Sequence, residues 1–376
     1  SQVAMMAECG IVLTEGYLSL RERRTVLERV VHLTESRMHV ELEHCRFAID
    51  LVKLMEEAGE KRAACDLLAT LHVETVINMP RVEKLDALNR LIRLCLELMD
   101  YDQVRLVSCR IHHRALSRPE ALQAKLTYFE LMRRYYEHRR SYFHVARCWY
   151  ETFLSETRED LQLEALSNMA VHYLIAEHSG EKELEEFAEC AAFSPATKFA
   201  DRSAAISGIT NSLQKRLECI QQLQYILQKF TSIELIREQV AGDVEVLCAN
   251  HPQLSAYPER QVLLRSRCSE HDLLVIARFY RRLRLERLAE LVGLSLQHTE
   301  EFIMMMVTCR TLYAKIDRVD GLVVFEAKEK ATEVVSAWNV SVERSVALLD
   351  KVSHLIVKER MLHGISRSHA SNRDGR

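Results

Sequence analysis

The chain has 376 residues, 48% hydrophobic and 28% charged, which excludes an intrinsically disordered protein and allows two or three domains. Its net charge of −3, without a long run of lysine or arginine, argues against a protein that binds nucleic acid mainly through charge. Ten glycines and five prolines are few helix breakers for this length, so we predict a mainly helical fold.

Two further features of the composition bear on where the protein works. No apolar run approaches the roughly 20 residues that span a bilayer, and no signal peptide opens the chain. The eleven cysteines are scattered without a Cys-x-x-Cys pair, which favours reduced thiols over a disulfide framework. We therefore expect a protein of the cytoplasm and nucleus.

A recurring helical unit organises the first half of the chain. Segments 60–67, 101–108 and 142–149 have similar patterns, and each begins 41 residues after the previous one. Pro80 and Pro119 stand where helices of this frame would begin. A period near forty built from helix pairs is typical of an α-solenoid, which we assign to residues 1–200.

Residues 201–270 are predicted to continue the helical fold with interruptions. The segment from 203 to 212 is less regular, and we expect a loop there. Residues 213–240 again have a helical pattern, and Asn250 to Pro258 predicts a turn region.

Residues 271–327 have the pattern of a winged helix. We expect helices over His271–Arg282 and Leu285–Leu294, and a third helix that Ser295 caps. A hairpin follows, because Asp320-Gly321 separates an alternating run from an apolar one and predicts a type I′ turn.

The charges of this winged helix favour binding to protein over binding to DNA. In a DNA-binding winged helix the start of the third helix meets the bases, but here residues 296–301 include Glu300 and Glu301. The basic cluster of Arg278, Arg281, Arg282, Arg284 and Arg287 precedes that helix, and we interpret it as a solvated or ion-paired face.

The last helix is predicted within residues 328–363, before a disordered tail over 364–376. Its apolar residues alternate at spacings of three and four, which is the heptad pattern of a helix that packs against other helices. Because a free-standing helix of this length needs a surface to bury its apolar face, we expect it to join a helical bundle. The residues of this pattern are Val335, Trp338, Val342, Ser345, Leu349, Val352 and Ile356.

The sequence has none of the motifs that identify common catalytic sites. There is no Gly-rich phosphate loop, no His-Glu-x-x-His motif and no Gly-x-Ser-x-Gly motif. The densest potential metal ligands are His39, His44 and Cys45, but the two histidines are five residues apart and do not share a helical face. We therefore predict no catalytic, metal or cofactor site.

Several segments resemble PCI-domain proteins, a family named for the proteasome lid, the COP9 signalosome and an initiation factor. The resemblance is specific from residue 271 to 361 and looser before, and residues 178–260 are longer than is usual in the family. The segments that carry it are 271–280, 287–295, 313–322, 336–338 and 353–361, with 40–43 and 71–75 in the solenoid.

The resemblance implies a non-catalytic scaffold subunit of the proteasome lid that supports ubiquitin-dependent degradation. Its implied partners are other PCI subunits, the metal-dependent deubiquitinase of the lid and the ATPase ring. It also implies that winged helices associate side by side through Tyr313, Lys315, Asp317, Val323 and Phe325. The final helix would enter a bundle formed by the last helices of several subunits, through Trp338, Val342, Leu349, Val352 and Ile356.

Three alternatives remain open from the sequence. A PCI subunit of the COP9 signalosome, similar to its fourth subunit, would keep the fold and change the assembly. A nucleic-acid-binding winged helix would use the basic cluster and bind with a steep salt dependence. An enzyme has no set of residues to support it.

Overall fold

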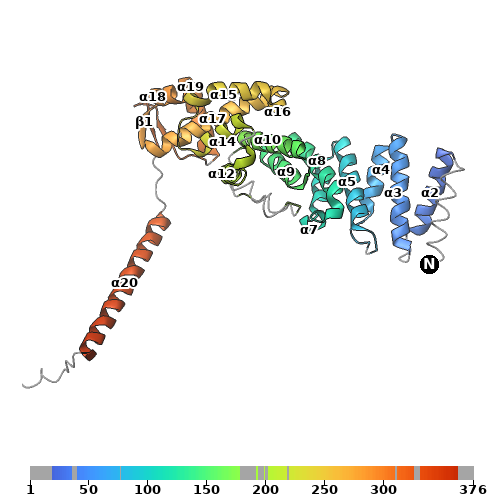
Figure 1. Cartoon of the computed structure of the whole chain (residues 1–376), viewed down its shortest axis with the longest axis horizontal. Helices are drawn as coiled ribbons and strands as arrows, with labels where there is room; N and C mark the ends of the chain where they lie inside the picture. The colour runs from blue at the N-terminus through green and yellow to red at the C-terminus, as the bar shows by residue number, and fades with distance from the viewer. Residues whose placement is uncertain are drawn as a thin grey trace, which may run out of the picture.

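The structure is a computed structural model. It describes residues 19–35, 40–76, 78–177, 192–193, 199, 202–217, 220–309, 311–325 and 331–362. The helices of the N-terminal half lie one behind another along the long axis of the molecule, and the winged helix lies at the far end (Figure 1). The predicted combination of an α-solenoid, a winged helix and a long last helix is therefore confirmed.

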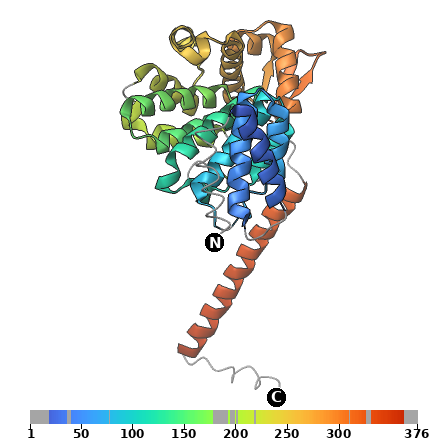
Figure 2. The same ribbon diagram turned by 90° about the vertical axis from the view of Figure 1, so that its right-hand side faces the viewer.

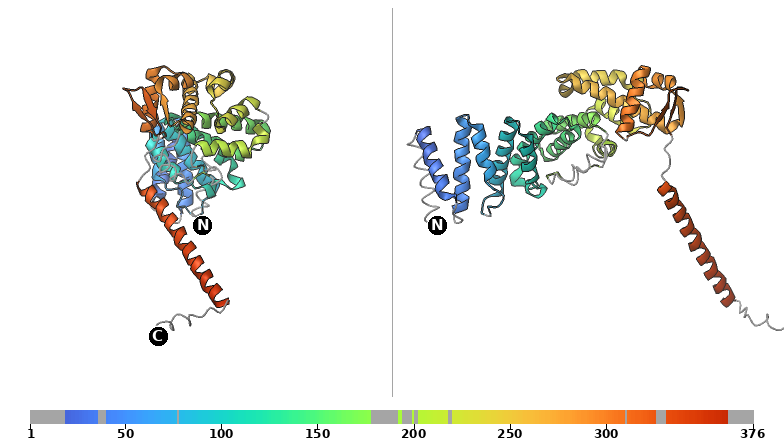
Figure 3. Two further views of the ribbon diagram at one scale, coloured as in Figure 1. Left: turned by 90° about the vertical axis from the view of Figure 1, so that its left-hand side faces the viewer. Right: turned by 180° about the vertical axis from the view of Figure 1, so that it is seen from behind.

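The first part of the chain consists of antiparallel helix pairs (Figure 3). The helices are α2 (Leu20–Thr34), α3 (Glu41–Glu57), α4 (Lys61–Thr70), α5 (Arg81–Glu97), α6 (Tyr101–Cys109), α7 (His113–Leu116), η2 (Pro119–Ala121), α8 (Leu122–His138), α9 (Tyr142–Ser155) and α10 (Glu159–Ile175).

The predicted repeat is confirmed, and a shared backbone turn explains it. Helices α3, α5 and α8 are each followed by a residue in the left-handed conformation: Gly59 with φ of 83°, Met99 with 60° and Arg140 with 57°. After each, the next amide donates back to the carbonyl five residues earlier, as in Glu60 N to Met55 O at 2.9 Å. These are Schellman caps, which satisfy carbonyls at the helix end and reverse the chain.

Two apolar cores run through the helical part. The first lies between α3, α4, α5, α6 and α8, and includes Leu51, Ile92 and Phe129. The second begins at α9 and α10, where Tyr173 and Leu174 are fully buried. The two cores join at α9, whose sides contribute residues to both.

The chain continues with α12 (Arg202–Ser212), α13 (Gln214–Leu217), α14 (Gln221–Thr231), α15 (Arg237–Asn250) and α16 (Pro252–Ser255), and all of these except α13 contribute residues to the second core. The expected loop over residues 203–212 is therefore wrong. The segment has an irregular pattern, but Ala205, Ile206 and Ile209 are buried in the second core and hold it as a helix. The helical segment expected over residues 213–240 is divided among α13, α14 and α15.

A buried cluster of charges joins the solenoid to the last part of the chain. The final carbonyls of a helix have no partner within the helix, so a buried helix end requires other donors. Arg202 on α12 donates to Tyr173 O and Leu174 O of α10, at 3.2 and 2.8 Å. Arg267 on α17 donates to Ile175 O at 3.3 Å. The carboxylate of Glu270 lies 2.8 Å from Arg267 Nη1 and 3.6 Å from Arg202 Nη1.

The winged helix contains α17 (Pro258–Phe279), β1 (Arg282–Arg284), α18 (Leu285–Val292), α19 (Leu296–Thr308), β2 (Lys315–Asp317) and β3 (Leu322–Val324). The first helix is therefore longer at its N-terminus than predicted, and it crosses the expected boundary at residue 271. It also ends before Arg282, because residues 282–284 pair with β3 in a sheet of order β1-β3-β2. The core of this unit includes Leu273, Leu288 and Ile303.

The turns of the winged helix agree with the predictions from the sequence, except for the hairpin turn. Ser295 Oγ accepts from His298 N and caps α19, as predicted. Gly293 has φ of 64° and ends α18, two residues earlier than the expected helix end at Leu294. The β2–β3 loop has four residues and only Gly321 in it has a positive φ, so the type I′ prediction is wrong. Asp317 Oδ1 accepts from Val319 N at 3.0 Å, and this bond supports the wider loop.

The last helix, α20 (Ala331–Leu362), projects away from the rest of the molecule in every view (Figures 1 and 2). All of its side chains whose exposure is described are exposed. The predicted disordered tail over 364–376 lies outside the described residues.

Gly59→Ala is expected to destabilise the solenoid, because a Cβ is unfavourable in the left-handed conformation by about 1–2 kcal/mol. Nothing lies within 4 Å of the added methyl, so the effect comes from the backbone alone. The matched control is Gly242→Ala inside α15, which has open space and should stabilise the protein by about 0.5–1 kcal/mol. Scanning calorimetry should give thermal midpoints that move in opposite directions. A shift in the same direction would contradict the assignment of the cap.

Glu270→Gln is expected to lower the free energy of unfolding by about 3 kcal/mol, because Arg202 and Arg267 would remain buried without their shared anion. The control is Glu290→Gln, which breaks the exposed pair with Arg287 and should cost less than about 1 kcal/mol. The thermal midpoints of both variants measure the difference. Equal midpoints would show that the buried cluster does not hold this junction.

Candidate protein-interaction surfaces

The free edge at β2 contains part of the predicted lateral contact. Lys315 and Asp317 are exposed, and Tyr313 is 38% exposed just before the strand. Val323 is fully buried and Phe325 is 9% exposed, because both belong to the core under the sheet. Val323 and Phe325 are therefore not exposed at this edge: Val323 faces the core from the central strand, and Phe325 packs in the same core just after that strand.

The start of α19 carries the acidic character that the sequence predicted. Gln297, His298 and Glu301 are exposed, and Glu300 forms an ion pair with Arg318 of the β2–β3 loop. A groove of DNA facing this helix would meet carboxylates, which phosphate repels. The geometry therefore favours a protein partner at this helix.

The basic cluster lies at the opposite side of the sheet from β2. Arg287 pairs with Glu290 at 2.7 Å, which agrees with the expected ion-paired face. Arg278, Arg281, Arg282 and Arg284 are all exposed. This part of the cluster is solvated in the isolated chain.

The apolar stripe of α20 is uncovered in the structure. Five predicted bundle residues are between 47% and 75% exposed: Trp338, Val342, Leu349, Val352 and Ile356. Burying a side chain of this size from water is worth about 1.5–3 kcal/mol. A helix with such a stripe has a strong driving force to associate with another apolar surface.

The residues considered as metal ligands do not form a metal site in the described part of the chain. Among those residues, no group of three or more His, Cys, Asp or Glu side chains could hold an ion. His44 Nδ1 is 2.8 Å from Thr34 Oγ1, and burial raises the pKa of the Cys45 thiol. His39 lies outside the described residues.

Two buried histidines serve the packing of the second half of the solenoid. His172 is fully buried, with Nδ1 2.6 Å from Asn168 O and Nε2 3.5 Å from Arg260 Nη1. Burial lowers the pKa of His172 to about 3, and it lowers the pKa of His144 well below the usual value. Both therefore stay neutral at pH 7.

His172 should make the protein less stable in acid. Its pKa is lower in the folded state than in the unfolded chain, so below about pH 6.5 protons bind preferentially to the unfolded chain. The free energy of unfolding is then expected to fall by about 1.4 kcal/mol per pH unit, and the loss should reach about 2 kcal/mol at pH 5. His172→Gln should reduce this slope when urea unfolding is followed at pH 7 and pH 5. An unchanged slope would contradict the role of His172.

None of the described helices combines the length and the apolar character that crossing a membrane requires.

Comparisons with known proteins agree with this architecture. The family model described as "PSMD12/CSN4, N-terminal" matches residues 1–161, and the model of the PCI domain matches residues 254–327. The 26S proteasome non-ATPase regulatory subunit 12 of Dictyostelium discoideum is 26% identical over 95% of this chain and 76% of its own length.

Two further relatives have names of the same kind. The 26S proteasome regulatory subunit RPN5 of Saccharomyces cerevisiae is 26% identical over 93% of this chain and 75% of its own length. The 26S proteasome non-ATPase regulatory subunit 12 homolog A of Arabidopsis thaliana is 25% identical over 92% of this chain and 80% of its own length. The similarity spans the solenoid, the winged helix and the connection between them, so the chain resembles 26S proteasome non-ATPase regulatory subunit 12 over most of its length and contains a match to the PCI domain.

Proposed function

We propose that this chain is a non-catalytic scaffold subunit of the lid of the 26S proteasome regulatory particle. In that role it would support lid assembly and ubiquitin-dependent protein degradation. The observation that carries the proposal is the similarity to regulatory subunits of the proteasome over more than nine tenths of the chain. The uncovered apolar stripe of α20 supports it, because such a stripe requires a partner.

Two surfaces would hold the chain in the particle. Tyr313, Lys315 and Asp317 at the β2 edge would contact a neighbouring winged helix from the side. The apolar stripe of α20, anchored by Trp338 and Leu349, would enter a helical bundle with other subunits. Its exposed heptad positions have the spacing that packing between helices needs.

The partners would be other PCI subunits of the lid, its metal-dependent deubiquitinase and the ATPase ring, in the cytoplasm and nucleus. In this role the chain would contribute binding surfaces and no chemistry. No nucleic acid is expected as a partner, since α19 presents carboxylates where a DNA-binding helix presents donors.

The test is affinity purification of the tagged protein from its own cells at moderate salt, with identification of the partners by mass spectrometry. Recovery of lid and ATPase subunits is expected. A signalosome subunit is the second candidate, since one matching family model is described by both PSMD12 and CSN4. Recovery of signalosome subunits, or of nucleic acid without a large complex, would overturn the proposal.

Leu349→Asp is expected to reduce incorporation into the particle at least tenfold, because it places a carboxylate in the apolar stripe of α20. Trp338→Ala should act in the same direction by removing the largest side chain of the stripe. The matched control is Ala347→Asp, which adds the same charge to the other side of the helix. Co-purified lid subunits measure incorporation, and circular dichroism checks that the rest of the chain is folded. Normal incorporation of Leu349→Asp and Trp338→Ala would refute the bundle.

A further inference from the structure

Two buried thiols meet between the first two repeats of the solenoid. Cys65 lies on α4, the second helix of one pair, and Cys95 lies on α5, the first helix of the next pair. Their Sγ atoms are 3.5 Å apart, and the two residues are 8% and 1% exposed. Both belong to the first apolar core, so the contact is held by the packing of the helices around it.

The repeat pattern does not by itself place thiols here. Cys65 is six residues after the left-handed residue that ends α3, and Cys95 is four residues before the one that ends α5. The same positions one repeat further on hold Arg105 and Tyr136. The pair of thiols is therefore a local feature of the joint between α4 and α5.

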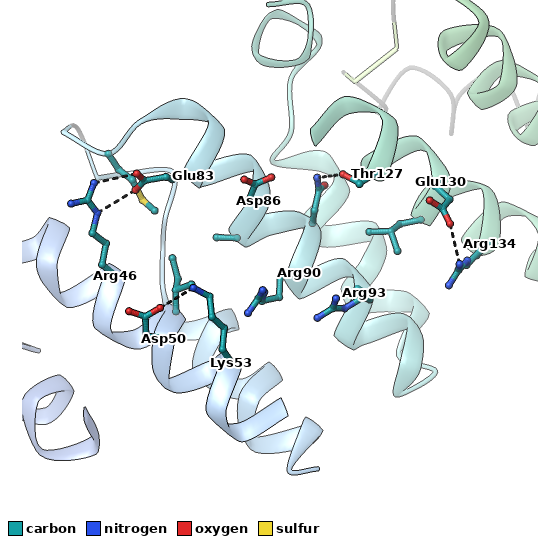
Figure 4. Close-up of a pocket in the computed structure, with 15 residues that line it drawn as sticks. Arg46, Asp50, Lys53, Glu83, Asp86, Arg90, Arg93, Thr127, Glu130 and Arg134 are labelled. Carbon is teal, nitrogen blue, oxygen red and sulfur yellow. Dashed lines mark hydrogen bonds and ion pairs between the residues drawn. The ribbon is translucent and has the colours of Figure 1, made fainter. Parts of the chain in front are cut away.

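Cys95 faces away from the groove that α3, α5 and α8 form. Figure 4 shows this groove, a cavity of about 740 Å³ whose charged lining includes Arg90 and Arg93 of α5. Cys95 follows Arg93 by two residues, which places it about 200° around the helix. A bond between the two thiols would therefore act on the packing of the helices without filling the groove.

The surroundings of the two thiols assign them different roles in an oxidation. Cys65 is the more exposed of the two, so a small oxidant that reaches the pair meets it first. Burial raises the pKa of both thiols, and the hydrogen bond between them opposes this rise at Cys65 and adds to it at Cys95. Because the thiolate is the nucleophile, Cys65 is the attacking group and Cys95 the group that resolves the intermediate.

The distance between the sulfur atoms brings a bond within reach. A disulfide needs them about 1.5 Å closer than they are here, which side-chain rotation and a small approach of α4 and α5 can supply. We propose that Cys65 and Cys95 are a redox modification site, at which a peroxide joins two successive repeats of the solenoid through a disulfide. Since each repeat contacts only its neighbours, this bond would restrict the bending of the solenoid at one defined joint.

The reaction balances with hydrogen peroxide as the oxidant. The Cys65 thiolate attacks one peroxide oxygen, the O–O bond breaks, and Cys65 becomes a sulfenic acid while hydroxide leaves. The Cys95 thiolate then attacks Cys65 Sγ, the S–O bond breaks, and a second hydroxide leaves as the S–S bond forms. The two thiols together lose two electrons and two protons, and the peroxide is reduced to two molecules of water.

The experiment uses the full chain, reduced with dithiothreitol and then freed of it. Hydrogen peroxide is added at pH 7.5, catalase stops the reaction, and N-ethylmaleimide in denaturant blocks the remaining thiols. Trypsin releases residues 63–81 and 94–105, each with a single cysteine. Mass spectrometry should detect these two peptides joined by a disulfide, at least tenfold more abundant than any other cysteine pair within one chain. Dithiothreitol should separate them again.

Cysteine variants and unfolding provide the controls. Cys65→Ser and Cys95→Ser should each abolish the joined peptides. The matched control is Cys45→Ser in α3, which removes a thiol of similar burial that has no described thiol within hydrogen-bond distance, and its yield should stay within twofold of the original. The same oxidation in concentrated urea should lower the yield at least tenfold, because the folded contact is lost.

Three results would overturn the proposal: no joined peptides from the original chain, an equal yield in urea, or an equal yield from another cysteine pair. The original chain alone decides these, so a variant that fails to fold does not affect them. Hydrogen exchange tests the restriction of bending: the amides of α4 and α5 should exchange at least twofold more slowly after oxidation, and those of α18 and α19 at the same rate. Unchanged exchange in α4 and α5 would refute the restriction. The isolated chain is used throughout, so the outcome does not depend on the proposed place in the lid.

Discussion

The end of α10 is the point on which the arrangement of the molecule depends. Its last carbonyls are buried among α12 and α17, where water cannot satisfy them. Arg202 and Arg267 supply the donors, and Glu270 neutralises both cations. Because Arg267 and Glu270 lie on α17, the same interaction that closes the solenoid fixes the helix that starts the winged helix.

Helix α17 runs without a break from this junction into the winged helix, so fixing its middle also fixes the start of the winged helix. The residues that bind the end of α10 occupy the middle of α17, and Leu273 and Ile276 near its C-terminus enter the winged-helix core. A single helix of 22 residues thus belongs to two packing units. Because α17 packs in both units, it places the winged helix next to the end of the solenoid.

The exposed surfaces of the molecule differ in their chemistry. The α20 stripe is apolar and suits a permanent bundle, because it gains most from complete removal from water. The groove on α3, α5 and α8 is lined by half-exposed side chains of both charges, which pair with one another and need no partner from outside the chain.

The sequence alone determined the elements whose local chemistry is strong: the period of the repeats, the cap at Ser295, and the heptad pattern of α20. Lys53, Arg93 and Arg134 also recur 40 and 41 residues apart, but only the folded repeats place them at the same position of α3, α5 and α8.

Only the tertiary structure decided the rest. Residues 203–212 become helical through burial of Ile206 and Ile209, and residues 282–284 become a strand through pairing with β3. All three residues of β3 are apolar, so the sequence did not show that Val323 faces the core while Leu322 and Val324 remain partly exposed. Arg202 and Arg267 are 65 residues apart, and no local pattern pairs them. Periodicity and capping act over a few neighbouring residues and can be read along the chain, whereas burial and strand order depend on contacts that exist only after the chain has folded.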